Sequence, residues 1–152
     1  MKCIKKRGIA VGGVAMALWL GAQTASAAMA APLSQVKVIK VQSPGCGLEN
    51  IVEKQEQTSC DHSGPDIKVY VLEIGYGSLS PHVALDGFNV DGTRTAVCAY
   101  QTGNLKECAS GETTVGYLYI FDLKGKQDGI FTFSNTSINA PRNTMSTQLY
   151  IK

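Results

Sequence analysis

Histidine is the first residue type to test for chemistry, because its side chain is the usual general base near neutral pH. The chain has only two, His62 and His82. His62 lies in the polar segment Cys60-Asp61-His62-Ser63-Gly64, where Asp61 is placed to orient its ring. We expect a solvated loop histidine there and a surface position for His82. Catalysis through His62, or a metal pair of both histidines with Asp61 or Asp66, is the less favoured alternative.

Other sequence signatures of catalysis are missing. The chain has no Gly-x-Ser-x-Gly elbow, no phosphate-binding Gly-x4-Gly-Lys loop and no His-Glu-x-x-His. The run Asp86 to Gly92 looks like a calcium loop, but its first ligand position falls on Gly87, so we interpret it as two Asp-Gly turns. A carboxylate pair for glycoside hydrolysis, such as Glu73 with Asp86, depends on separation in space and stays open. We predict neither a metal nor a cofactor.

Four cysteines predict two disulfides. Of the three possible pairings of Cys46, Cys60, Cys98 and Cys108 we favour the two local ones, because each encloses a short loop containing turn residues. Each closure is worth roughly 2.5 to 3 kcal/mol on a chain-entropy estimate. A four-thiolate zinc site is disfavoured, because neither local pair has the two-to-four-residue spacing that lets adjacent thiolates reach one ion.

The sequence pattern predicts that residues 1–27 form a signal peptide. A basic segment, Lys2 to Arg7, precedes an apolar core, Ile9 to Ala22, and the small-x-small site Ala25-Ser26-Ala27 follows. Cleavage there leaves one domain, residues 28–152, and a second site at Ala28-Met29-Ala30 would move the start to Ala31. The fifth cysteine, Cys3, and the only tryptophan, Trp19, lie in the signal. The prediction is a secreted or periplasmic protein with oxidised cysteines.

The charge of the predicted mature domain disfavours two classes of partner. Four of the 14 Lys and Arg residues lie before position 28 and all 12 acids lie after it, so ten cations face 12 acids and the domain carries −2. A weakly acidic domain without a basic block lacks the electrostatic footprint of a nucleic-acid binder. No second apolar run is long enough to span a membrane, so we expect no membrane partner after cleavage. The oligomeric state is not indicated.

Apolar residues recur mostly with period two from Val36 onward, which is typical of strands. The first strand, Val36 to Val41, has a phase slip, and Ile67 to Ile74 is apolar on both faces, so we expect it in the centre of a sheet. Only Leu48 to Gln57 has helical spacing, and a helix there is left open. Further strands are expected at 83–85, 88–90, 95–100, 114–123, 130–134 and 145–151. The pattern predicts an all-β antiparallel sandwich or small barrel with two disulfide-closed loops, and an open sheet with covering loops is the alternative.

The segment Ser134 to Thr147 is unusually rich in Asn, Ser and Thr. We favour a long loop whose side chains hydrogen-bond their own backbone, with Arg142 as a clamp. The alternative is a polar recognition surface, because loops held by a rigid sheet often carry binding. Its candidate binding residues are Asn135, Asn139, Arg142 and Asn143.

Two segments carry a family resemblance, Lys68 to Gly77 and, more specifically, Gly129 to Thr147. With the start at Ala31 to Val38, and with Cys98 and Cys108 ahead of Gly116-Tyr117-Leu118-Tyr119, the chain resembles the YolA-like family of small secreted bacterial proteins. The family is of unknown function. The resemblance therefore implies a secreted bacterial protein but no activity and no catalytic residue. It also marks the Cys46 and Cys60 pair as an addition in this chain.

Three functions remain. The first is a secreted or periplasmic binding module for an extracellular or cell-surface ligand, favoured because catalytic signatures are missing. The second is a small hydrolase using carboxylates or His62, and the third is a structural or matrix component. Saturable binding without turnover favours the first, turnover lost in His62→Ala or Glu73→Gln favours the second, and concentration-dependent assembly favours the third.

Overall fold

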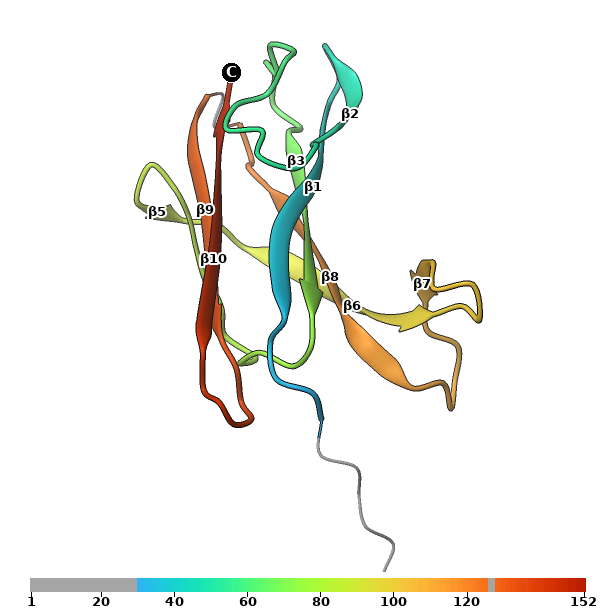
Figure 1. The fold of residues 1–152 in the computed structure, drawn as a ribbon. Coiled ribbons are helices and arrows are strands. Elements are labelled where there is room, and N and C mark those ends of the chain that lie inside the picture. The colour runs from blue at the N-terminus through green and yellow to red at the C-terminus, as the bar shows by residue number, and fades with distance from the viewer. Residues whose placement is uncertain (1–29, 126–127) are drawn as a thin grey trace, which may run out of the picture.

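The computed structural model describes residues 30–125 and 128–152, and within them the chain forms two antiparallel β-sheets and no helix (Figure 1). The larger sheet has the strand order β2 (Gly47–Asn50), β1 (Gln35–Ser43), β3 (Lys68–Ile74), β8 (Thr114–Asp122), β6 (Gly92–Ala99), β7 (Leu105–Glu107). The smaller sheet has the order β10 (Thr144–Ile151), β9 (Gly129–Thr136), β4 (His82–Leu85), β5 (Phe88–Asn89). The expected all-β antiparallel architecture is confirmed.

The strands follow the sequence pattern closely. The phase slip in the first strand is a register shift between Val38 and Lys40, where β1 pairs with β3. A bulge of this kind admits one extra residue, so the apolar residues on either side of it still face the core. β3 lies between β1 and β8, as expected for a strand that is apolar on both faces. Its Val71 faces the core, and Leu72 on the opposite face is also buried.

Two short strands were not expected. Gly47–Asn50, which overlaps the start of the segment with helical spacing, is β2 and pairs with the second half of β1. Leu105–Glu107 is β7 and closes a hairpin with β6 inside the second cystine loop. Both are edge strands that present largely exposed side chains, so they carry no period-two apolar signal.

The two Asp-Gly dipeptides behave differently. Asp86 and Gly87 have φ values of 48° and 81° and form the two-residue turn between β4 and β5. Asp91 and Gly92 form no such turn, because here the chain crosses from the smaller sheet to the larger one. A Cβ on Gly92 would lie 2.4 Å from Phe121 Cδ1, so this glycine is required by close packing.

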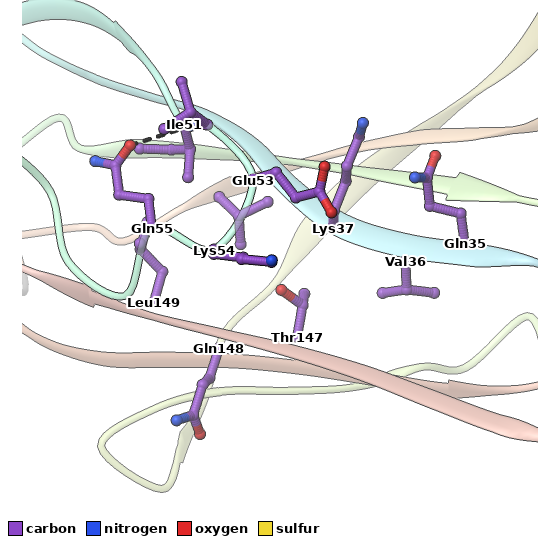
Figure 2. Close-up of a pocket in the computed structure, with 12 residues that line it drawn as sticks. Gln35, Val36, Lys37, Ile51, Glu53, Lys54, Gln55, Thr147, Gln148 and Leu149 are labelled. Carbon is purple, nitrogen blue, oxygen red and sulfur yellow. Dashed lines mark hydrogen bonds between the residues drawn. The ribbon is translucent and has the colours of Figure 1, made fainter.

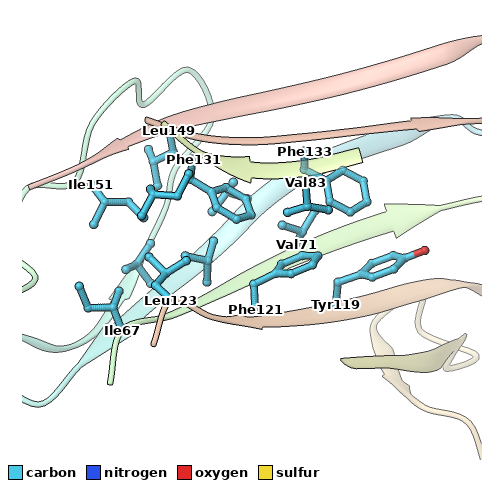
Figure 3. Close-up of a cluster of buried hydrophobic side chains, with 14 of the residues drawn as sticks. Ile67, Val71, Val83, Tyr119, Phe121, Leu123, Phe131, Phe133, Leu149 and Ile151 are labelled. Atoms are coloured by element: carbon cyan, nitrogen blue, oxygen red, sulfur yellow. The ribbon is translucent and has the colours of Figure 1, made fainter. Parts of the chain in front are cut away.

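A single core lies between the two sheets (Figure 3). The larger sheet contributes valines from β1 and β3 and the rings of Tyr119 and Phe121 from β8, while Phe131 and Phe133 of β9 cover them. The ring centroids of Tyr119 and Phe133 are 5.1 Å apart and those of Phe121 and Phe131 are 5.6 Å apart. The shared core makes the fold a sandwich of two sheets, and the alternative of an open sheet with covering loops is wrong.

Both predicted disulfides are formed, Cys46–Cys60 and Cys98–Cys108. The four-thiolate zinc alternative is thereby excluded. The first disulfide closes a loop that links the two sheets, because Ile51 N donates to Ile39 O of β1 while Thr58 N donates to Tyr150 O of β10. In the described ranges no helix is long and apolar enough to cross a membrane.

Candidate functional site

Three of the four candidate binding residues use their side chains in hydrogen bonds to other parts of the protein. Asn135 is buried at the end of β9, and its Nδ2 donates to Glu73 Oε2 at 2.7 Å. In the connection 137–143, Asn139 Nδ2 donates to Ala30 O and Asn143 Nδ2 donates to Leu33 O at 3.0 Å. Half of the segment expected to be one long loop, 134–136 and 144–147, is therefore strand, and the asparagines of the connection between them hold the residues that precede β1.

Arg142 does not act as a clamp. Its side chain is exposed, and it makes no hydrogen bond or ion pair with any residue that the structure describes. The clamp hypothesis is wrong, because the side-chain hydrogen bonds that hold this connection come from Asn139 and Asn143. Its planar fork of N–H donors remains available to an anionic partner.

Glu73 is a fully buried carboxyl on the core side of β3. Besides Asn135, it accepts hydrogen bonds from Gly77 N at 3.2 Å and the Tyr119 hydroxyl at 3.5 Å. Burial raises the pKa of Glu73, and these three donors and the positive charge of Arg94 only partly counteract it. The same burial and the neighbouring carboxyl raise the pKa of Tyr119 to about 12.

Glu73 and Asp86 do not form a catalytic pair. Asp86 Oδ1 accepts from Ile130 N near the start of β9, whereas Glu73 contacts Asn135 near the end of that strand. Five residues of strand separate the two contacts, about 17 Å, which is beyond either glycosidase spacing. The burial of Glu73 also keeps it from a substrate.

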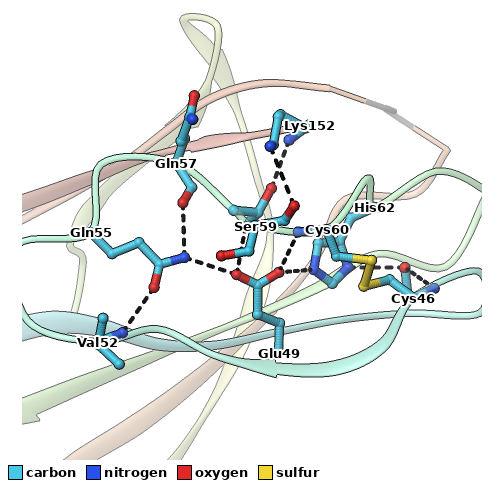
Figure 4. A network of polar contacts seen from close by, with 11 residues as sticks. Cys46, Glu49, Val52, Gln55, Gln57, Ser59, Cys60, His62 and Lys152 are labelled. Atoms are coloured by element: carbon cyan, nitrogen blue, oxygen red, sulfur yellow. Dashed lines mark hydrogen bonds and ion pairs between the residues drawn. A yellow bond between two sulfur atoms is a disulfide. The ribbon is translucent and has the colours of Figure 1, made fainter.

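His62 is completely buried, so the expectation of a solvated loop histidine is wrong (Figure 4). Its Nδ1 is 2.9 Å from Ser43 Oγ and its Nε2 is 3.1 Å from Glu49 Oε2, while its backbone N–H donates to Lys152 O. Asp61, the expected orienting residue, is exposed and contributes nothing to this chain of contacts. The sequence does contain a signal for this burial. Ser43 and Glu49 lie on either side of Cys46, and His62 lies two residues after Cys60, so the Cys46–Cys60 disulfide brings these polar side chains together.

Glu49 is the most heavily hydrogen-bonded side chain of this network (Figure 4). One carboxylate oxygen accepts from Gln55 Nε2 at 2.8 Å and Ser59 N at 2.7 Å, and the other from Cys60 N at 3.0 Å and His62. Burial alone would raise its pKa, but the four donors outweigh burial and lower the pKa to about 2. Glu49 is therefore a permanent anion that holds the disulfide loop.

Ser43, His62 and Glu49 have the contact order of a hydrolytic triad. Ser43 is only 3 % exposed, however, and its Oγ also accepts from Cys46 N at 3.2 Å. A substrate carbonyl cannot reach this hydroxyl without opening the turn that carries Cys46. In the geometry described, the three residues brace the loop.

A cleft of about 230 Å³ lies at the open edge of the sandwich, between β1, β10 and the segment 51–55 (Figure 2). Val36, Val38 and Leu149 form its apolar floor. Figure 2 shows Val36, Lys54 and Thr147 around one space, whereas the side chain of Gln148 points away. The remaining lining is mixed, with Ile51 and Val52 beside the polar residues Gln35, Lys37, Glu53 and Gln55.

The Glu49 network positions one wall of this cleft. Gln55, which donates to Glu49, also accepts from Val52 N at 3.1 Å, and Gln55 N donates to Val52 O. Lys54, between them, has a φ of 67°, a conformation that costs a non-glycine residue of order 1 kcal/mol. The buried network therefore holds a strained turn that directs Lys54 toward the cleft.

Two strand edges beside the cleft lack partners. Within residues 30–125 and 128–152, Gln35–Val38 pair only with β3, and Thr144–Leu149 pair only with β9. Unpaired strand edges are the groups that an added extended chain can hydrogen-bond. The cleft thus combines an apolar floor, charged rim residues and available backbone.

Comparison with known proteins identifies the family and nothing more specific. No curated protein and no solved structure matches the chain. The model of the family described as "Domain of unknown function (DUF4879)" matches residues 24–151. The match covers every strand from β1 to β10, and the chain therefore belongs to the DUF4879 family.

Proposed function

We propose that the protein is a secreted or periplasmic binding module and that its cleft between β1 and β10 holds the ligand. The observation that carries the proposal is a contrast in accessibility. Ser43, His62 and Glu73 are all sealed from solvent, whereas the cleft is lined by one carboxylate, Glu53, and by no His, Ser or Cys. Acid–base and nucleophilic groups must reach a substrate, so the accessible chemistry favours binding over turnover.

The form of the cleft favours an extended peptide of an extracellular or cell-surface protein. The free edges of β1 and β10 offer backbone N–H and C=O groups, which give affinity in strand addition, and the apolar floor of Val36, Val38 and Leu149 would select the side chains that face it. Lys37, Lys54 and Glu53 supply charges of both signs at the rim. The two disulfides and the predicted signal peptide support a location outside the cytoplasm.

A peptide-display screen tests the cleft directly. Random peptides displayed on phage are selected on the immobilised protein, and the enriched peptides are measured by calorimetry. We expect Lys54→Glu and Thr147→Trp, which change the rim charge and fill the cleft, to weaken binding by about tenfold or more. Leu79→Ala, an exposed position in the connection between β3 and β4, is the matched control. Equal affinity of all four proteins would exclude the cleft.

The Ser43-His62-Glu49 contacts support a second candidate, a small hydrolase. Turnover would require the turn at Cys46 to open and expose the Ser43 hydroxyl. The test is hydrolysis of p-nitrophenyl acetate by the wild type, Ser43→Ala and His62→Gln. Turnover that both substitutions remove would support the hydrolase, and equal background rates in all three proteins would leave binding as the function.

A further inference from the structure

The Cys46–Cys60 disulfide lies beside two more side chains that bind metals. Cys46 Sγ, a carboxylate oxygen of Glu49 and a ring nitrogen of His62 all lie within 4.8 Å of one another. Cys60 Sγ is bonded to Cys46 Sγ but is not one of these three grouped atoms, so it would join them as a second thiolate only after the disulfide is reduced. Two sulfurs, one nitrogen and one oxygen are a donor set that Zn²⁺ takes in tetrahedral coordination.

The four ligands come from two short segments. Cys46 and Glu49 have two intervening residues, which is typical of a zinc ligand pair, whereas Cys60 and His62 have only one. The spacing of the cysteines alone does not reveal these two pairs, because the second ligand of each pair is not a cysteine. The other disulfide, Cys98–Cys108, has no such group around it in the part of the chain that the structure describes.

We infer that this disulfide is exchangeable for a zinc site, so that the reduced protein binds one Zn²⁺ through Cys46, Cys60, Glu49 and His62. A dithiol supplies two electrons and two protons, the S–S bond breaks, and the dithiol itself is oxidised to a disulfide. Zn²⁺ then displaces the two thiol protons and is bound by two thiolates, the neutral imidazole and the carboxylate. The site carries a net charge of −1.

Neighbouring groups already orient the two non-sulfur ligands. The Ser43 hydroxyl, 2.9 Å from His62 Nδ1, can either donate to that nitrogen or accept from it. In the oxidised protein Nε2–H donates to Glu49; when a metal takes the place of that hydrogen, the hydroxyl can accept from Nδ1–H, which leaves Nε2 for the metal. Gln55 and the Ser59 amide hold one oxygen of Glu49, and the other oxygen faces His62.

Both cysteines of this disulfide are partly exposed, whereas in Cys98–Cys108 only Cys108 is partly exposed and Cys98 is 2 % exposed. An open pocket of about 360 Å³, lined by Asp61, Ser63, Asp128 and Lys152, lies beside the buried His62. A dithiol can reach the partly exposed sulfurs, and breaking the S–S bond frees the loop to admit a metal ion to His62.

Cobalt titration tests the inference, because Co²⁺ reports tetrahedral thiolate coordination by its colour. The protein is reduced with dithiothreitol, freed of the reductant under nitrogen and titrated with Co²⁺ and then Zn²⁺. We expect one equivalent of Co²⁺ to give thiolate charge-transfer and tetrahedral visible bands, which Zn²⁺ removes. Glu49→Gln and His62→Gln should each weaken the affinity by about tenfold or more.

Three controls make the result decisive. The Cys46→Ser/Cys60→Ser double variant and the oxidised wild type should give no bands, and Cys98→Ser/Cys108→Ser should keep them. Zn²⁺ should also protect Cys46 and Cys60, but not the other two thiols, from iodoacetamide in peptide mass mapping. Reduced protein that takes up no metal, that loses its sheet signal in circular dichroism on binding, or that still binds without Cys46 and Cys60 would overturn the inference.

Discussion

Glu49 and Glu73 show how the same side chain responds to different hydrogen-bond partners. Both are withdrawn from water, which by itself raises the pKa of a carboxyl. Four donors, two of them backbone amides, reverse that effect at Glu49, whereas the three donors at Glu73, two of them at 3.2 and 3.5 Å, do not. Glu49 therefore holds its loop in the ionised form, whereas the raised pKa of Glu73 favours the protonated form.

The raised pKa of Glu73 predicts a stability that depends on pH. Because the folded state holds this proton more tightly than the unfolded chain, the free energy of unfolding falls as pH rises from about 4.5 through the raised pKa. Glu73→Gln cannot titrate and should flatten this part of the profile, while Glu53→Gln, at an exposed position, should not. Urea unfolding at a series of pH values measures the free energy of unfolding. Wild-type and Glu73→Gln curves of this free energy against pH that superimpose would contradict the prediction.

Glu49→Gln tests the anion that holds the disulfide loop. The amide has one acceptor oxygen where the carboxylate accepts from four donors, so buried N–H groups lose their partners. We expect a loss of about 2 to 3 kcal/mol at neutral pH. Thermal unfolding measures the loss against Glu56→Gln, an exposed neighbour, and equal melting temperatures would show that the network adds nothing to stability.

The connection 137–143 gives a prediction opposite to the clamp hypothesis. Arg142→Lys should leave the melting temperature within about 1 °C of the wild type, since no described residue contacts the guanidinium. Asn143→Ala should lower the free energy of unfolding by about 1 kcal/mol through the lost bond to Leu33 O. Calorimetry of the two variants should show this order, and the reverse order would restore Arg142 as a structural residue.

At the scale of elements, the two disulfides hold different parts of the sandwich. Cys98–Cys108 closes the β6–β7 hairpin within one sheet. Cys46–Cys60 closes the loop that contacts β1 through Ile51 and β10 through Tyr150, and so bridges both sheets. Only Cys46–Cys60 therefore supports the wall of the cleft.

This difference predicts distinct effects of removing each disulfide. Cys46→Ser/Cys60→Ser and Cys98→Ser/Cys108→Ser should each cost roughly 2.5 to 3 kcal/mol, because the loops have similar lengths. Hydrogen exchange should then increase at the amides of Ile51 and Tyr150 in the first variant and along β7 in the second. Exchange that increases equally everywhere in both variants would contradict a local role.

At the scale of the whole molecule, the export signal makes a prediction that lies outside the described residues. Cleavage after Ala27 gives a protein that begins at Ala28, or at Ala31 if the second site is used. Either product lacks Trp19. Intact mass spectrometry of the exported protein should therefore show the shorter chain, and its emission spectrum should show no indole fluorescence. A tryptophan signal in the purified native protein would exclude both sites.

The sequence by itself determined the local architecture. Eight of the strands, the phase slip in β1, the turn at Asp86 and both disulfides follow from period-two spacing, positive-φ residues and short cysteine loops, which are properties of neighbouring residues. β2 and β7 were missed because exposed edge strands bury too little to leave a pattern. The asparagines of the last hairpin were recognised as unusual, but their partners were not.

Only the tertiary structure decided which side chains are accessible. His62 has a polar sequence environment and yet is buried, because the disulfide folds its loop onto Ser43 and Glu49. The cleft arises because β1 and β10, far apart in sequence and in different sheets, lie side by side at one edge of the sandwich (Figure 1). Burial and contacts between distant strands depend on how the sheets pack, and no local spacing in the chain encodes that packing.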